Sequence, residues 1–299
     1  MKVVSLRLCA LALLIFALES GAPGDAQPSS GTDSNTIIVN GHRLPAATLE
    51  ARVSRFVRGR GKYSRIDQIT MWRDPVCPLV RNLPAAYGAF ISARIEEIAR
   101  NVGAPTIQQC SPNIEIIFTP QPQTVMDEVA VHSPTLLGFH FAPNTRALAT
   151  VTKPIQAWYV TATSNGVQTV IDGPLNPQPG GTAGSRLTHG LQSVLMHVLI
   201  LVNTNEISGR PVGPIADYLA MLSLSQITAQ EQGRCVDVAS MTNLFSADCP
   251  DTLKPQSLTI ADMAYLEGIY SMGPSDIGSL QRSAIFSRMV RRMRGGAGA

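Results

Sequence analysis

A run of almost uniformly apolar residues, Ser193–Val202 (SVLMHVLILV), constrains the fold of this chain more than any other feature. Its length and its content of Val, Leu and Ile predict a β-strand, and the lack of a polar face predicts that this strand is covered on both sides. Shortly afterwards, Gly213 and Pro214 open a segment of helical length that is apolar nearly all round and runs to about Ile227. Such a helix has to pack against the sheet and be overlaid by other elements. The two segments favour a layered α/β domain.

The rest of the chain alternates between strand and helix patterns. Further strands are predicted where β-branched and aromatic residues cluster, at Thr36–Asn40, Ile66–Trp72, Asn113–Thr119 and Ile155–Thr163. Apolar stripes at helical spacing predict helices at about 45–59, Pro84–Val102, Thr124–Val131, Thr259–Tyr270 and Leu280–Arg294. The pattern predicts an α/β (α+β) fold in a single domain over residues 46–299, with a mixed sheet of about four to five strands packed by helices.

Two stretches between these elements are predicted to be irregular. Pro75–Pro78 should interrupt regular structure before the helix that begins near Pro84, because each proline lacks a backbone donor. Asp172–Arg186 is rich in Gly, Pro and Asn, and we expect it to connect two strands of the sheet as a long loop. Loops of this length are often functional or mobile.

The first residues have the pattern of a secretory signal. Lys2 and Arg7 precede the apolar run Leu8–Leu18, and Gly24-Asp25-Ala26 supplies a small-x-small cleavage site, which predicts a signal peptide over residues 1–26. The apolar run is shorter than the roughly 20 residues of a membrane span, and no later segment predicts one. Residues 27–45 are predicted to be a flexible leader with a short strand. We therefore expect a periplasmic or secreted protein with no transmembrane segment after signal removal.

Four cysteines follow the predicted signal, at Cys77, Cys110, Cys235 and Cys249. An even number of cysteines in an exported chain predicts two disulfides. Sequence order favours Cys77 with Cys110 and Cys235 with Cys249, since each pair flanks one compact unit, although the other two connectivities remain open. A zinc site is the competing interpretation, but these spacings lack the short C-x-x-C pairs of such sites.

Composition and charge narrow the classes of partner. With 44% apolar and 15% charged residues, the chain is unlike disordered, coiled-coil or collagen-like proteins, and its net charge of +3 gives no support to a nucleic-acid partner. Basic residues nevertheless gather near both ends of the domain, at Arg52, Arg55, Arg58, Arg60, Lys62 and Arg65, and at Arg288, Arg291, Arg292 and Arg294. The favoured interpretation is solvated helix faces. The alternative is peripheral contact with an anionic membrane through Arg288, Arg291 and Arg292.

The order of elements is similar to the catalytic subdomain of zincin metalloproteases, which carry H-E-x-x-H on the helix after the last strand. That chemistry needs two histidines one turn apart to hold zinc and a glutamate to deprotonate the bound water. The equivalent helix here offers only Asp217 and Tyr218 as polar candidates near its start. We favour a role for Asp217 in stabilising the positive end of its own helix, with a polar site shared with Tyr218 as the alternative. No metal and no cofactor are predicted.

The five histidines give a weaker signal. His197 alternates with apolar neighbours in the Ser193–Val202 run and is predicted to be a core residue. His140 and His189 are placed near loops from which they could reach a cleft, so they are weak catalytic candidates. The sequence contains no G-x-S-x-G, G-x-G-x-x-G or P-loop motif.

Several segments together resemble an uncharacterised family of secreted Gram-negative envelope proteins. They are Trp72–Pro78 (WRDPVCP), Pro112–Thr119 (PNIEIIFT), Pro154–Tyr159 (PIQAWY), Ala216–Gln226 (ADYLAMLSLSQ) and Ala261–Tyr270 (ADMAYLEGIY). The resemblance implies a periplasmic location and a single domain, and it implies no catalytic residues.

These features together favour an exported, non-catalytic binding or envelope-associated protein whose ligand or protein partner is unknown. The alternative is a hydrolase, for example a degenerate zincin-like metallopeptidase, with a site assembled only in the fold. That alternative predicts that Asp217, Tyr218 and one of His140 or His189 share one cleft.

Overall fold

The structure is a computed structural model, and it describes residues 46–60, 64–138, 142–174, 176–177, 179–180, 190–228, 230–273 and 276–295. All of these belong to the second of the two compact units into which the chain divides, Met1–Gly41 and His42–Ala299. The predicted signal peptide, the predicted leader and the strand predicted at Thr36–Asn40 lie outside the described residues. So does most of the second half of the predicted loop Asp172–Arg186.

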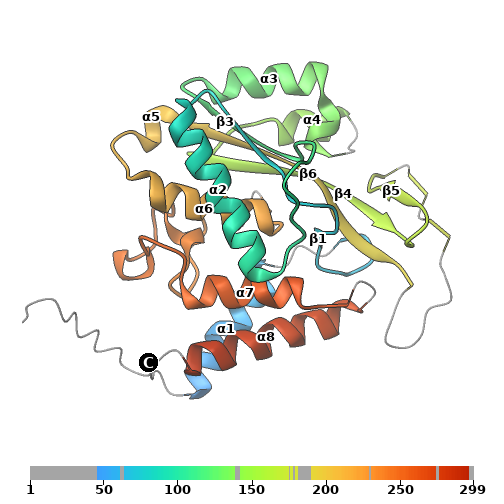
Figure 1. Cartoon of the computed structure of the whole chain (residues 1–299), viewed down its shortest axis with the longest axis vertical. Coiled ribbons are helices and arrows are strands. Elements are labelled where there is room, and N and C mark those ends of the chain that lie inside the picture. The colour runs from blue at the N-terminus through green and yellow to red at the C-terminus, as the bar shows by residue number, and fades with distance from the viewer. Residues whose placement is uncertain are drawn as a thin grey trace, which may run out of the picture. The chain divides into compact units, whose positions relative to one another are not determined.

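The described elements alternate between helices and strands along the chain (Figure 1). The α-helices are α1 (Ala46–Arg60), α2 (Ala85–Val102), α3 (Pro122–His132), α4 (Ala142–Leu148), α5 (Thr204–Ile207), α6 (Val212–Leu224), α7 (Ile260–Tyr270) and α8 (Gly278–Gly295). Three short 3-10 helices are η1 (Pro134–Leu137), η2 (Met241–Asn243) and η3 (Asp251–Leu253). The strands are β1 (Met71–Trp72), β2 (Pro78–Arg81), β3 (Ile114–Thr119), β4 (Ile155–Ser164), β5 (Thr169–Ile171) and β6 (Gln192–Asn203).

The strands form one mixed sheet in the order β2-β3-β6-β4-β5, and β1 also pairs with β6. The pairs β1–β6, β2–β3 and β3–β6 are parallel, whereas β4 pairs antiparallel with both β6 and β5. The long apolar strand β6 is central, with Ile116 of β3 opposite Ile200 on one side and Trp158 of β4 opposite Leu199 on the other. The predicted mixed α/β fold is confirmed, and its sheet has six strands among the described residues rather than four or five.

Two differences in strand content arise before α2, and a third is the short strand β5, which pairs antiparallel with β4 and is not predicted by the sequence. The strand predicted at Ile66–Trp72 is reduced to Met71–Trp72, because Asp67 adopts a left-handed conformation (φ 54°) and its N–H closes a turn onto the carbonyl of Ser64. The segment after Pro75 is not irregular throughout, since Pro78 begins β2. Proline is tolerated there because it occupies the first position of an edge strand.

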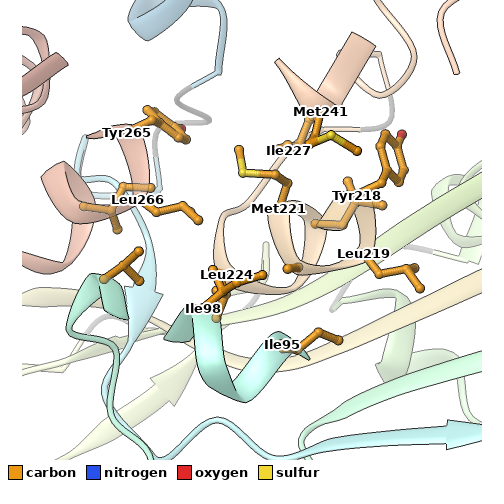
Figure 2. Close-up of a cluster of buried hydrophobic side chains, with 14 of the residues drawn as sticks. Ile95, Ile98, Tyr218, Leu219, Met221, Leu224, Ile227, Met241, Tyr265 and Leu266 are labelled. Carbon is orange, nitrogen blue, oxygen red and sulfur yellow. The ribbon is translucent and has the colours of Figure 1, made fainter. Parts of the chain in front are cut away.

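One large core lies on the face of the sheet that α2 and α6 cover, and α1, α7 and α8 pack into the same core. Ile95 and Ile98 of α2 meet Leu219 and Leu224 of α6 in this core, as Figure 2 shows. Every residue of α6 from Ile215 onward is buried, which confirms the prediction of a helix that is covered on all sides.

The opposite face of the sheet is covered by α3 and η1, which form a smaller core with β4 and β6. Its buried residues are Met126, Leu137, Ala149, Trp158, Leu199 and Leu201. Strand β6 is therefore covered on both faces, as its composition predicts.

Two disulfides join Cys77 to Cys110 and Cys235 to Cys249. The first links the segments that lead into β2 and β3, and the second closes the region between α6 and α7. Among the described residues, no helix is long and apolar enough to cross a membrane.

Candidate functional site

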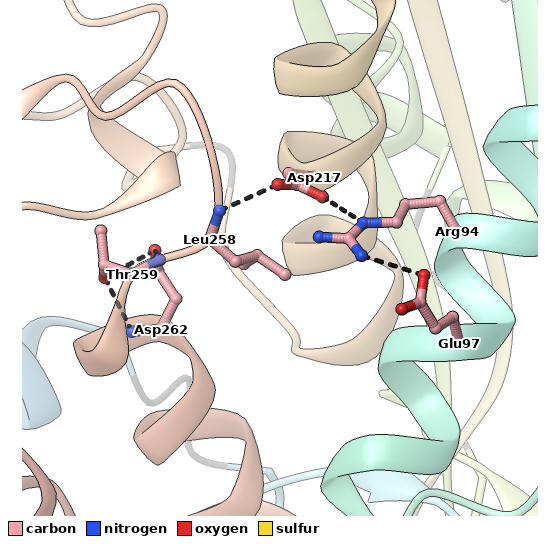
Figure 3. Close-up of polar contacts among 6 residues, drawn as sticks. All are labelled: Arg94, Glu97, Asp217, Leu258, Thr259 and Asp262. Carbon is pink, nitrogen blue, oxygen red and sulfur yellow. Dashed lines mark hydrogen bonds and ion pairs between the residues drawn. The ribbon is translucent and has the colours of Figure 1, made fainter. Parts of the chain in front are cut away.

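Asp217 is fixed by groups from two neighbouring elements (Figure 3). Its Oδ1 accepts a hydrogen bond from Arg94 Nε of α2 at 2.7 Å, and its Oδ2 accepts the backbone N–H of Leu258, just before α7, at 2.8 Å. The Asp217 side chain is 4% exposed and that of Arg94 is 31% exposed. The hydrogen bond to Asp217 raises the pKa of Arg94, so the guanidinium stays protonated.

This geometry corrects the role predicted for Asp217. The residue lies beyond the first turn of α6, which contains no acidic side chain, so it does not stabilise the positive end of its own helix. The beginning of α6 at Val212, ahead of the predicted Pro214, moves Asp217 deeper into the helix. Asp217 instead holds α2, α6 and the approach to α7 together.

Tyr218 is buried beside Asp217 but contacts different partners. Its ring meets Phe245 edge to face, with the centroids 4.9 Å apart. Burial raises the pKa of Tyr218 to about 12, and the nearby Arg60 opposes that shift. A phenol with this pKa stays protonated near neutral pH and is poorly suited to act as a general base.

The structure describes only part of the predicted catalytic group. Asp217 and Tyr218 are neighbours in α6, but His140 and His189 lie outside the described residues, so their shared cleft stays a prediction. His197 is half-buried on β6, and its Nδ1 has no hydrogen-bond partner among the residues that the structure describes. Within the described ranges, no three His, Cys, Asp or Glu side chains gather as a metal site would require.

The basic residues of the two terminal helices are less solvated than their spacing suggests. The prediction of a solvated helix face is wrong for Arg60, which is 1% exposed at the end of α1. In α8, Arg288 and Arg292 both pair with Glu267 of α7, at 3.4 and 2.6 Å. Arg291, the third arginine proposed for membrane contact, is exposed and has no ion pair within the described structure. The proposed contact with a membrane stays a prediction.

The region that most resembles a ligand-binding site is the edge of the sheet at which β2, β3 and β6 end. These parallel strands finish at Arg81, Thr119 and Asn203. After β2 and after β6, the chain continues into helices on the face covered by α2 and α6. After β3, it continues into α3 on the opposite face. Ligands of open α/β sheets bind where neighbouring connections diverge in this way, because a crevice opens between them.

A pocket of about 460 Å³ lies at this edge, and we call it the edge pocket. Its walls come from α2, β3, α5, α6 and the loops between them, and they are lined by Leu83, Tyr87, Ile91, Phe118, Thr204, Ile207, Ser208, Arg210, Val212 and Ile215. Arg210 is the single charged lining residue, and its guanidinium stacks over the ring of Phe245, 5.1 Å from the centroid. The edge pocket is therefore mainly apolar, and its cation is already engaged by an aromatic ring.

A second pocket of about 530 Å³ begins at the same edge beside α3 and is mainly polar. It is lined by Gln121, Pro122, Gln123, Thr124, Val151, Thr152, Lys153, Asn203 and Glu206. Neither Asp217 nor Tyr218 lines this pocket or the edge pocket. The two pockets lie on either side of the strand ends, as expected for a crevice between diverging connections.

Sequence reasoning missed the edge pocket because it follows from strand pairing. The ends of the parallel strands are the feature that could have located the edge pocket. The sequence does not predict β2, however, and no local pattern shows that β3 runs parallel to β6. Comparisons of the chain with protein-family models, with characterised proteins and with solved structures found no match. The resemblances to secreted envelope proteins and to zincins therefore stay predictions.

Proposed function

We propose that this chain is an exported, non-catalytic binding protein that holds a small apolar molecule in the edge pocket. The observation that carries the proposal is the mainly apolar pocket at the carboxyl ends of β2, β3 and β6. Its volume of about 460 Å³ lies within the roughly 300 to 1,000 Å³ of small-molecule sites.

The lining favours an uncharged or weakly polar ligand. Ile91, Phe118 and Ile215 are buried, and they present carbon atoms to the space. Thr204 and Ser208 add hydroxyl groups near the mouth, which suits a ligand with one polar end. The half-exposed ring of Tyr87, 53% exposed, lies on the wall formed by α2, where a bound molecule would cover it.

Two observations support export to the periplasm or the medium. Residues 1–26 have the pattern of a signal peptide, and two disulfides form within the domain. Disulfides persist in oxidising compartments and are rare where thiols are kept reduced.

Fluorescence titration with the neutral apolar probe N-phenyl-1-naphthylamine tests the proposal on the oxidised chain, residues 27–299. We expect a saturable rise in emission that the substitution Ser208→Phe weakens at least tenfold, because the new ring occupies the pocket from an exposed lining position. The matched control is Ser283→Phe, which places the same ring on an exposed position of α8. No saturable binding, or an equal loss in both variants, contradicts the proposal.

The hydrolase alternative is tested on the same preparation. The chain is incubated with one equivalent of zinc and with chromogenic peptide and ester substrates. Tight zinc binding together with hydrolysis that Asp217→Ala abolishes without unfolding the domain would replace the binding function with an enzymatic one.

A further inference from the structure

Among the described residues, Arg60 has no carboxylate in contact, although its charge is buried. It is the last residue of α1 and is 1% exposed. Its Nη1 and Nη2 donate to the backbone carbonyls of Glu231 and Arg234, each at the long distance of 3.4 Å, and its Nε has no partner in the described part of the chain. Burying a cation with so few strong hydrogen bonds is costly unless an anion compensates it.

The surroundings of Arg60 compensate its charge only in part. Burial lowers the pKa of Arg60 from its usual value, and the fields of Glu231 and Asp262 oppose that shift from a distance. Glu231 is occupied elsewhere, because its Oε2 accepts both the N–H and the hydroxyl of Thr228, at 3.2 and 3.0 Å. Asp262 is likewise saturated by four donors from Ser240, Met241 and Thr259.

A pocket of about 340 Å³ adjoins Arg60, and we call it the Arg60 pocket. Its lining carries three arginines and two carboxylates. Arg55 and Asp237 neutralise each other in an exposed pair at 2.8 Å, whereas the exposed Arg234 forms no ion pair in the described part of the chain. The lining therefore carries one excess positive charge, and its two guanidinium groups without carboxylate contacts are Arg60 and Arg234.

The rest of the wall is apolar. Phe56 lies under the Arg60 guanidinium, 5.7 Å from ring centroid to Cζ, and Val236 and Cys235 of the second disulfide complete the lining. The exposed guanidinium of Arg234 can receive a carboxylate through two parallel hydrogen bonds, while the nearly buried Arg60 adds the attraction of its uncompensated charge, and the neighbouring carbon surface suits an aromatic or aliphatic body.

We propose that the Arg60 pocket is a second binding site, which takes a small organic acid with one carboxylate directed at Arg60 and Arg234 and an apolar body against Phe56 and Val236. The Arg60 pocket shares no lining residue with the edge pocket, so this proposal stands independently of the proposed function. One negative charge on the ligand matches the one excess positive charge of the lining.

Calorimetric titration with benzoate, and with the neutral isostere benzamide as the matched ligand, tests the proposal on the oxidised chain. We expect benzoate to bind and benzamide to bind at least tenfold more weakly. Arg234→Gln, at an exposed position, should weaken benzoate binding about three- to tenfold, and Arg60→Met should abolish it. The control Arg58→Gln changes an exposed arginine of the same helix that does not line the pocket, and it should leave binding unchanged.

Arg234→Gln keeps the test decisive if Arg60→Met does not fold. Ser208→Phe, which blocks the edge pocket, should leave benzoate binding intact. The proposal is overturned by equal binding of benzoate and benzamide, by no benzoate binding to the unmodified chain, or by an equal effect of Arg58→Gln and Arg234→Gln. Inorganic phosphate that binds as tightly as benzoate would also overturn it, because it would assign the site to another class of anion.

Discussion

Asp217 shows how a single charged side chain can organise the interior of this domain. Its two oxygens accept from Arg94 on α2 and from the N–H of Leu258, so the removal of the carboxylate leaves two donors unsatisfied at one point. Because Arg94 is nearly a third exposed, water can replace part of the lost interaction.

We expect Asp217→Ala to lower the free energy of unfolding by about 2 kcal/mol. A double-mutant cycle with Arg94→Ala should give a coupling energy of about 1 kcal/mol, measured by urea denaturation. Additive effects of the two substitutions would show that Asp217 acts through something other than this pair.

The half-buried His197 should make the stability of the domain depend on pH. Burial lowers the pKa of His197 below its usual value of about 6.5, while Glu115 opposes that shift, and the Nδ1 atom has no acceptor to stabilise an added proton. The unfolded chain therefore binds a proton at a higher pH than the folded chain. In the window below about pH 6.5, stability falls as the pH falls, until the folded pKa is passed.

We expect the free energy of unfolding to decrease from about pH 7.5 to about pH 5, and His197→Gln should reduce this slope. Ser283→Gln, at an exposed position of α8, is the control, because it introduces the same amide without removing an ionisable group, and it should preserve the slope. Denaturant titrations at several pH values measure the slope of the free energy of unfolding against pH. An unchanged slope in His197→Gln would show that His197 does not cause it.

At the scale of elements, six of the eight described α-helices were predictable to within a few residues because their signals are local, whereas the short helices α4 and α5 were not predicted. The apolar stripe and Gly103, which has φ 84°, mark α2 and its end, and the capping box of Thr259 and Asp262 marks the start of α7. The short strands β2 and β5 were not predicted, and only the last two residues of the strand predicted at Ile66–Trp72 form β1. Strands β1 and β2 exist because they pair with β6 and β3, which are distant in sequence, and pairing over such distances leaves no local periodicity.

The contact between α7 and α8 depends on one small residue. A Cβ added to Gly268 would lie 3.0 Å from Cα and Cγ1 of Ile285, closer than side chains normally approach. Gly268→Ala should therefore force the helices apart and lower the free energy of unfolding by about 1 to 3 kcal/mol. Gly213→Ala in α6 meets nothing within 4 Å and should be neutral or mildly stabilising. Thermal denaturation of both variants compares their melting temperatures. Equal values would contradict the close packing of α7 against α8 at Gly268.

At the scale of the whole molecule, both pockets bring together residues that are far apart in the sequence. The edge pocket takes Tyr87, Phe118 and Ile207 from three elements, and the Arg60 pocket joins the end of α1 to residues near Arg234. The sequence identified the residues that bury the core, since apolar composition suffices for that purpose. It could not show that Arg60 is buried or that Asp217 faces α2, because both depend on which helices become neighbours.

The second disulfide links the stability of the molecule to the Arg60 pocket. Replacement of Cys235 and Cys249 by Ala should lower the free energy of unfolding by about 3 kcal/mol and should also weaken benzoate binding, because Cys235 lines that pocket. Replacement of Cys77 and Cys110 should destabilise the fold by a similar amount without affecting benzoate affinity. Calorimetric titration with benzoate measures the affinity of both double variants. Equal losses of affinity would show that the second disulfide has no specific effect on the Arg60 pocket.

The most direct test of the binding function is NMR mapping of the isotope-labelled, oxidised chain during titration with N-phenyl-1-naphthylamine. We expect the largest amide shifts on Tyr87, Thr204, Ile207 and Ser208, around the carboxyl ends of the parallel strands. Shifts that fall mainly on other surfaces, or no saturable shifts at all, would contradict the binding function.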